Sequence, residues 1–214
     1  MSEVLRINFD RSYKLWSACE DTNLVDDKME YVYFLNGNAY ASNRHIVAKV
    51  PLELCTTFQP EDYAKLNNCR IHRTILKMLC SFQVVTISED WNIINHDGKL
   101  LNEKGDPERF VQISAARGDN YITVELLQCK AAPDFESIFK IEGEREPIRS
   151  LGIRVKFLGD LCAAMGISSV KMRFSQFNGK VFVEDVSSVD GPKASGVIMP
   201  LQLDPTLPGM EDYE

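Results

Sequence analysis

The chain has 214 residues, of which 44% are apolar and 26% are charged, a composition typical of a globular protein and unlike that of a disordered chain or a coiled coil. Its 24 Lys and Arg against 31 Asp and Glu give a net charge of −7. The chain as a whole is therefore not a basic nucleic-acid coat, and any contact with DNA must come from a local basic patch.

The cysteines and apolar runs indicate the compartment. None of the six cysteines forms a Cys-x-x-Cys pair, and no His lies at zinc-ligand spacing from one of them. The N-terminus has no apolar stretch of signal-peptide length, and no apolar run approaches the ~18 residues of a membrane span. We therefore expect a reduced cytoplasmic protein without metal or cofactor, whose cysteines pack as small apolar side chains.

The first part of the chain predicts a strand, a helix and three further strands. The expected elements are a strand at 4–9, a helix at 11–20 with Asp10 as its cap, and strands at 31–35, 39–42 and 45–50. Asn36-Gly37 lies between two of these strands and favours positive φ at both turn positions, which predicts a hairpin.

The same order of elements recurs twice. The second round comprises a strand at 68–71, a helix at 73–82 and strands at 84–87, 110–113 and 121–127. The third comprises a strand at 153–157, a helix at 158–165 ended by Gly166, and strands at 170–174, 181–183 and 197–199. A Leu precedes a Cys by four residues in each helix, in the pairs Leu15/Cys19, Leu76/Cys80 and Leu158/Cys162. This spacing places both residues on one helix face, and the three rounds predict an internal repeat.

Three segments of the chain carry features of one known protein family. They are YASNRHIVAKVPL at 40–52, KAAPDFESIF at 130–139, and the segment 153–203 with SSVKMRFSQFNGKVFVEDV and GVIMPLQL. They resemble bacterial sliding DNA clamps, the processivity factors of replicative polymerases. The first is similar to the family's Ala-Thr-Asp-Gly-His-Arg-Leu-Ala strand, the second to its Pro-Asp-Tyr segment between the middle and last domains, and the third to its C-terminal part with a Met-Pro-Met-Arg-Leu-like end. The order matches, but Arg44 replaces Gly, and Ile46 and Ser137 replace Arg.

The resemblance implies an α+β fold of DNA-clamp-like repeats, each of strand, helix and strands. Residues 1–142 would form one clamp-like domain of two half-units, and 143–204 a third half-unit. Residues 205–214 would form an acidic flexible tail. The third half-unit would lack a mate within the chain, which predicts a homodimer or a higher homo-oligomer. The alternative is that residues 83–130 cover its exposed edge and leave a monomer.

The residues give little sign of an enzyme. The sequence contains no Gly-rich phosphate loop, no Gly-x-Ser-x-Gly elbow and no His-Glu-x-x-His. His45 falls in an expected strand and His96 in an expected turn, where structural roles are the simpler interpretation. Carboxylates occur at Glu89-Asp90, Asp134/Glu136 and Glu184-Asp185, at no spacing that identifies a nuclease or hydrolase. We expect no enzymatic activity, although a carboxylate site assembled in space stays an open alternative.

The three expected helices are rich in bases and poor in acids, on a chain that is acidic overall. An ordinary solvated helix face would explain any one of them, but the three together favour a surface that faces phosphates. Such contacts hold duplex DNA independently of its sequence, and in clamps the helices line the DNA side. The predicted DNA-facing residues are Arg11, Lys14, Arg70, Arg73, Lys77, Arg154 and Lys156.

The family also binds short peptides of polymerases and other replication proteins in a pocket between its middle and last domains. Carried over by motif, this partner-peptide pocket would comprise Ser42, His45, Val47, Pro133, Ile138, Val197, Met199, Leu201 and Leu203. A core role would explain the apolar residues among them equally well. The resemblance thus implies a sliding-clamp-like processivity factor or scaffold for replication and repair. The alternatives are a peptide-binding adaptor that has lost DNA binding, or a nucleic-acid enzyme.

Overall fold

The computed structural model describes residues 7–21, 27–90, 109–129, 132–140, 152–174, 179–186 and 191–200. Its strands are β1 (Tyr31–Leu35), β2 (Asn38–Ser42), β3 (Ile46–Pro51), β4 (Cys69–His72), β5 (Val84–Asp90), β6 (Phe110–Arg117), β7 (Asn120–Gln128), β8 (Val170–Phe174), β9 (Val181–Asp185) and β10 (Ser195–Ile198). Its helices are α1 (Leu52–Cys55), α2 (Pro60–Leu66), α3 (Arg73–Leu79), α4 (Phe135–Phe139) and α5 (Val155–Met165), with the 3-10 turns η1 (Leu15–Ala18) and η2 (Asp27–Glu30).

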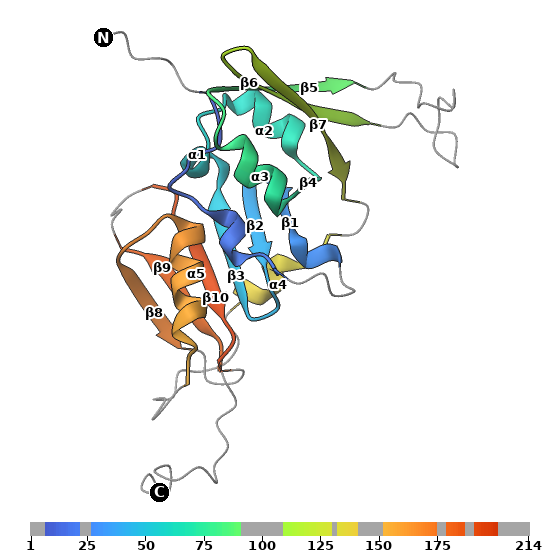
Figure 1. The fold of residues 1–214 in the computed structure, drawn as a ribbon. Coiled ribbons are helices and arrows are strands. Elements are labelled where there is room, and N and C mark those ends of the chain that lie inside the picture. Colours follow the sequence, from blue (N-terminus) through green and yellow to red (C-terminus); the bar gives the residue numbers. More distant parts are fainter. Residues whose placement is uncertain are drawn as a thin grey trace, which may run out of the picture.

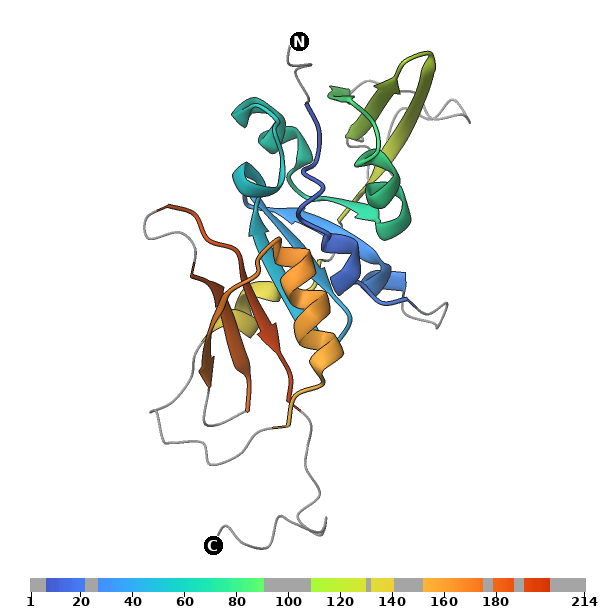
Figure 2. The same cartoon turned by 60° about the vertical axis from the view of Figure 1, so that its left-hand side comes forward.

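The strands form one ten-stranded sheet in the order β5-β6-β7-β4-β1-β2-β3-β10-β9-β8, and every neighbouring pair is antiparallel. Figures 1 and 2 show η1, α3 and α5 on one side of this sheet, which we call the helix side. The mixture of sheet and helices is an α+β fold. In chain order η1, α3 and α5 are each followed by three strands, while the expected repeat of one unit stays a prediction.

Both faces of the central strands are covered, which explains their nearly continuous burial. Val32 and Phe34 of β1 point into the main core on the helix side, with Leu76 of α3 and Leu161 of α5. Tyr33 lies between them in sequence and packs on the opposite face, which we call the outer face, against α4. The alternation of side chains along a strand places these residues on opposite faces.

The Asn36-Gly37 hairpin is confirmed, with φ of 50° and 73° at the two turn residues joining β1 to β2. Both values lie in the left-handed region that a two-residue hairpin of this type requires. Gly166 also ends its helix as expected, with φ of 67°.

The N-terminal segment differs from its prediction. In place of a helix at 11–20, it contains only η1, preceded by a turn in which the Asp10 carboxylate accepts from the Ser12 amide. The Lys14 amide donates to the Ala163 carbonyl of α5 at 2.8 Å, so it does not make the hydrogen bond within the segment that a helix would require. Within the expected strand 4–9, Ile7 and Phe9 form isolated bridges, and residues 4–6 lie outside the described residues. Tertiary hydrogen bonds replaced local ones here.

The third round begins with a helix where a strand at 153–157 was expected. Helix α5 starts at Val155, which is 84% exposed, and buries Phe157, Leu161, Ala164 and Met165 at helical spacing. Leu158 and Cys162 are only half-buried, so this pair does not form the core face of its helix. The corresponding pairs at 15/19 and 76/80 are buried as expected.

Three short helices, α1, α2 and α4, were not predicted. For α2 the sequence carried a signal, because Pro60 occupies its first turn and Glu61 and Asp62 follow. Helix α3 ends at Leu79, three residues earlier than the expected limit of 82.

The third round does find a mate within the chain, contrary to expectation. Strand β10 pairs with β3, with Val197 opposite Val47, so the sheet continues without a break into β9 and β8. Helix α5 lies against β10 where Gly196 leaves room, because a Cβ at Gly196 would lie 2.6 Å from a methyl of Leu161. The proposed division at residue 142 stays a prediction.

Candidate functional site

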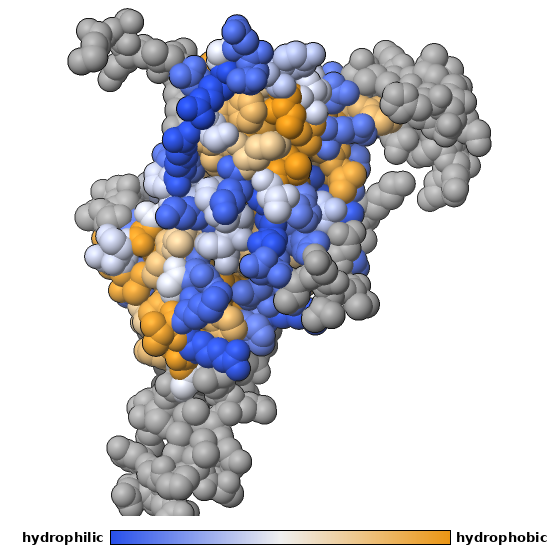
Figure 3. Space-filling view, in the orientation of Figure 1, coloured by the Kyte–Doolittle hydropathy of each residue, from blue (hydrophilic) through white to orange (hydrophobic). Residues whose placement is uncertain are grey.

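A hollow of about 340 Å³ opens on the helix side, between η1, α3 and α5. It brings together three of the predicted DNA-facing residues, Arg73 and Lys77 of α3 and Lys156 of α5, beside Trp16 of η1. Arg73 and Lys77 are four residues apart and therefore share one face of α3. Hydrophilic residues extend across the middle of this side of the molecule, with apolar patches above and at the lower left (Figure 3).

Acidic side chains balance much of the positive charge in this hollow. Arg73 pairs with Asp21, and Lys156 donates to Asp160 at 2.6 Å. Glu20 also lines the hollow and pairs with Arg44 at 3.6 Å. The charges that line the hollow therefore nearly cancel, and attraction for an anion on this side depends on cations that form no ion pair.

Three of the predicted DNA-facing residues are less compensated. Lys14, Lys77 and Arg154 are exposed and form no ion pair within the described part of the chain. Arg154 lies over the Phe157 ring, with its guanidinium carbon 5.5 Å from the ring centroid. Arg11 instead donates from Nε to the Cys80 carbonyl at 2.6 Å, which ties the N-terminal segment to the end of α3.

Arg70 does not share a face with Arg73 and Lys77. It lies in β4, ahead of the helix, and its Cα pairs with that of Tyr33. Because side chains alternate across a strand, Arg70 points to the outer face while Cys69 and Ile71 are buried in the core on the helix side. Its guanidinium lies 4.4 Å from the centre of the Tyr31 ring.

On the outer face, α4 is held against the sheet by aromatic and polar contacts. Phe135 stacks on Tyr40 with 5.0 Å between ring centroids and a 9° angle between planes. Glu136 accepts hydrogen bonds from the Tyr40 hydroxyl and, at 2.6 Å, from Lys49 Nζ. The Lys49 bond and then the Tyr40 bond lower the pKa of Glu136, whereas burial raises that of Tyr40. This cluster fixes the segment that resembles the clamp family's interdomain connection.

Beside α4 lies a second, smaller hollow of about 200 Å³ over β3, β10 and β9. Phe139 and Phe182 form its apolar walls, and Lys49 and the Arg173–Glu184 ion pair supply its charges. None of these residues was predicted. The alternation of apolar and basic residues in Val170–Phe174 was a usable signal for Arg173, because it placed Arg173 on the strand face opposite the apolar residues.

The predicted peptide-pocket residues divide between the two sides of the sheet. Val47 packs on the outer face with Phe135 and Ile138. Cross-strand pairing with Val47 places Val197 and Ser42 on the same face. Met199 follows β10 and is half-buried. Pro133 precedes α4 and is half-buried. Leu201 and Leu203 lie outside the described residues.

His45 departs from this group. Its ring stacks on Phe157 of α5 at 4.7 Å, and it lines the hollow on the helix side. The preceding residue, Arg44, has φ of 71°, a left-handed conformation that favours glycine. Asn43 supports this turn, because its Oδ1 accepts from the amides of His45 and Ile46. The turn that directs His45 toward α5 is thus built by local hydrogen bonds.

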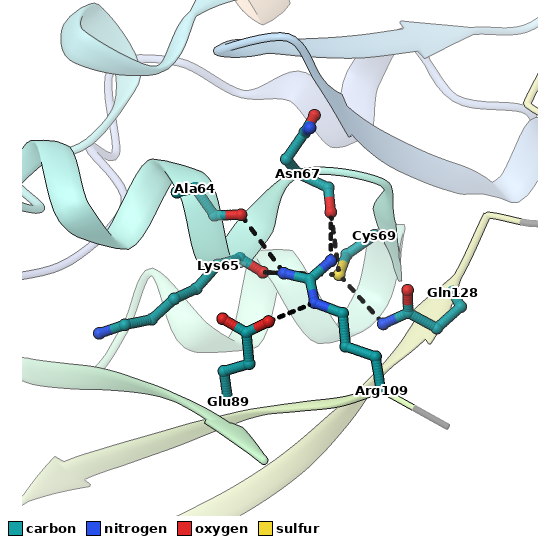
Figure 4. A network of polar contacts seen from close by, with 7 residues as sticks. All are labelled: Ala64, Lys65, Asn67, Cys69, Glu89, Arg109 and Gln128. Carbon is teal, nitrogen blue, oxygen red and sulfur yellow. Dashed lines mark hydrogen bonds and ion pairs between the residues drawn. The ribbon is translucent and has the colours of Figure 1, made fainter. Parts of the chain in front are cut away.

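Arg109 organises the opposite end of the sheet (Figure 4). Its guanidinium donates to the carbonyls of Asn67 and Lys65 at 2.7 Å each, and to that of Ala64 at 3.3 Å. Its Nε donates to Glu89 at 2.6 Å. One side chain therefore caps the C-terminus of α2 and joins it to β5 and β6.

The thiols are poorly suited to nucleophilic or metal chemistry. Burial raises the pKa of Cys19 to about 12 and that of Cys129 to about 11. Within the described residues, no group of three His, Cys, Asp or Glu side chains is placed to hold a metal ion. The described part of the chain also contains no helix long and apolar enough to cross a membrane.

Comparison with solved structures identifies a similar fold. The chain is similar to the H. pylori beta clamp, solved in complex with diflunisal, with a TM-score of 0.56 and 11% sequence identity. The similarity covers 93% of this chain and 66% of the clamp chain, so the chain spans just under two thirds of that protein. No protein-family model and no curated protein sequence matches the chain. The fold is therefore clamp-like.

Proposed function

We propose that the protein is a sliding-clamp-like factor without enzymatic activity, which contacts duplex DNA through its helix side and serves replication or repair proteins as a processivity factor or scaffold. The observation that carries this proposal is that Arg73, Lys77 and Lys156, from α3 and α5, line one hollow on the helix side of a clamp-like fold. Their contacts would be with phosphates, which position a duplex without reading its sequence.

The test is binding of two unrelated duplexes as a function of salt, measured by fluorescence anisotropy. We expect Lys14→Ala, Lys77→Ala and Arg154→Ala together to weaken binding to both duplexes equally. The slope of log K against log salt should flatten by about 0.9 for each phosphate that the variant no longer neutralises. The matched control removes three exposed cations elsewhere, Arg117, Lys140 and Lys171. An equal decrease in affinity in both triple variants, or none in either, would refute a DNA-binding helix side.

The second candidate is a peptide-binding adaptor that does not bind DNA. The hollow lined by Phe139 and Phe182 favours it, because its aromatic walls suit an apolar side chain. An acidic group of the peptide would compete with Glu136 and Glu184 for Lys49 and Arg173. Two results together would distinguish the adaptor. A short peptide with apolar and acidic residues should bind the chain but not its Phe182→Ala variant, and the chain should show no salt-dependent binding to either duplex.

A homodimer or higher homo-oligomer belongs to the same proposal. Strands β5 and β8 stand at the two ends of the sheet order. Within the described residues β8 pairs on one side only, and the outer side of β5 carries a single bridge, from Val84 to Ile7. Unpaired strand edges are sites at which chains associate. Light scattering at micromolar concentration tests this, and a mass of 24.3 kDa at every concentration would refute it.

A further inference from the structure

The outer face contains a pocket unrelated to either surface described above. Its volume is about 420 Å³, and residues 125–129, at the end of β7, form one wall. Lys28, Tyr33, Arg70, Arg109 and Phe110 complete the lining. We call it the β7 pocket. Because Tyr33 and Arg70 point to the outer face, the β7 pocket lies across the sheet from the hollow of the helix side.

Arg70 is the unusual residue of the β7 pocket. Its Nε is buried and has no hydrogen-bond partner, and it forms no ion pair within the described residues. The buried Nε atoms of Arg73 and Arg173 also lack partners, but each of those side chains binds a carboxylate through another nitrogen. A buried guanidinium N–H without a hydrogen-bond partner is costly, so Arg70 at the wall of a pocket is suited to bind an anionic ligand.

The other cations of the β7 pocket have different roles. Arg109 is satisfied by Glu89 and the carbonyls at the end of α2, so it is a wall of the pocket and has little capacity for a ligand. Lys28 is exposed and supplies a second positive charge. The Tyr31 ring beneath Arg70 limits the directions in which the guanidinium can turn. The Arg70 guanidinium is therefore oriented before any ligand binds.

The lining narrows the ligand class. Leu127 is 45% exposed, and Phe110, Tyr33 and Cys129 add further apolar surface. Glu125 contributes one negative charge, which disfavours a phosphate dianion more than a monoanion. A planar carboxylate matches the guanidinium fork through two parallel hydrogen bonds. We propose that the β7 pocket binds the carboxylate of an organic acid with an apolar or aromatic body, and that Arg70 is the residue that recognises it.

Two sources could supply this chemistry, a small organic acid or the C-terminal carboxylate of a peptide. The probes are 2-naphthoate with its neutral analogue 2-naphthamide, and N-acetyl-Ala-Leu with its C-terminal amide. Titration is followed by backbone amide NMR shifts and by calorimetry on the full chain. We expect the acid of at least one pair to shift residues 126–129 and to bind about tenfold or more tightly than its amide. The responding pair identifies the source.

Variants test the role of Arg70. Arg70→Met should raise the Kd of the acid to that of the amide. The control is Arg117→Met, at the turn between β6 and β7, which should leave the Kd unchanged. Arg70→Lys keeps the charge without the fork and should retain only part of the preference for the acid, which also decides the matter if Arg70→Met fails to fold. Equal binding of acids and amides, shifts confined to other surfaces, or full affinity in both Arg70 variants would overturn the proposal. DNA binding should be unchanged throughout.

Discussion

Removing the Arg109 side chain should be among the most destabilising single changes in the protein. Arg109→Ala would delete the bonds to three backbone carbonyls and leave Glu89 without its cation. Both side chains of the ion pair are largely buried, with 17% and 23% of their surfaces exposed. Breaking a buried pair by removing one partner costs about 3–5 kcal/mol, and the remaining exposure reduces our expectation to about 2–4 kcal/mol.

Urea unfolding measures this destabilisation as a lower midpoint at constant m-value. Arg109→Lys keeps the charge but cannot donate to three carbonyls and a carboxylate together, so it should recover only about half of the free energy. In a double-mutant cycle with Glu89→Gln, the coupling free energy should be about 1 kcal/mol or more. A destabilisation below about 0.5 kcal/mol for Arg109→Ala would place this side chain in the range of an ordinary surface position and refute the reasoning.

Two further predictions concern α4 and α5. Because Lys49 lowers the pKa of Glu136 in the folded state, this carboxylate adds stability above its unfolded pKa and loses it as the pH falls through the folded value. The free energy of unfolding of Glu136→Gln should therefore depend less on pH between about 5 and 3, as urea titrations at each pH would measure. Gly196→Ala should lower the free energy of unfolding by about 1–3 kcal/mol, because the new methyl group meets Leu161. In a chain that already carries Leu161→Ala, the same Gly196→Ala substitution should cost less.

Local chemistry made part of the fold predictable. The hairpin at Asn36-Gly37 and the helix end at Gly166 both depend on positive φ, a preference that these residues carry wherever they occur. The helix expected at 11–20 failed because the backbone of Lys14 donates to Ala163, almost 150 residues away in the sequence. The sequence around Lys14 gives no indication of this long-range hydrogen bond.

The candidate surfaces were predictable to a similar degree. The basic residues of α3 and α5 could be identified by composition, and the structure places them on one side of the sheet. The acids that neutralise them, Asp21 and Asp160, could not be assigned as partners without the fold. Arg70 was expected together with Arg73 and Lys77, but it lies in a strand that ends one residue before Arg73, and a helix and a strand place side chains differently.

The charge balance of the helix side links the proposed DNA contact to assembly. With Arg73 and Lys156 already paired to acids, three exposed cations remain as the main source of attraction for phosphates. Three phosphate contacts correspond to a salt slope of about −2.7, far shallower than the slopes of proteins that neutralise many phosphates. A protein that contacts the duplex through so few phosphates without encircling it would dissociate readily at physiological salt. Retention along DNA would then require closure around the duplex, so a variant that no longer self-associates should have no processivity even where the initial contact with DNA survives.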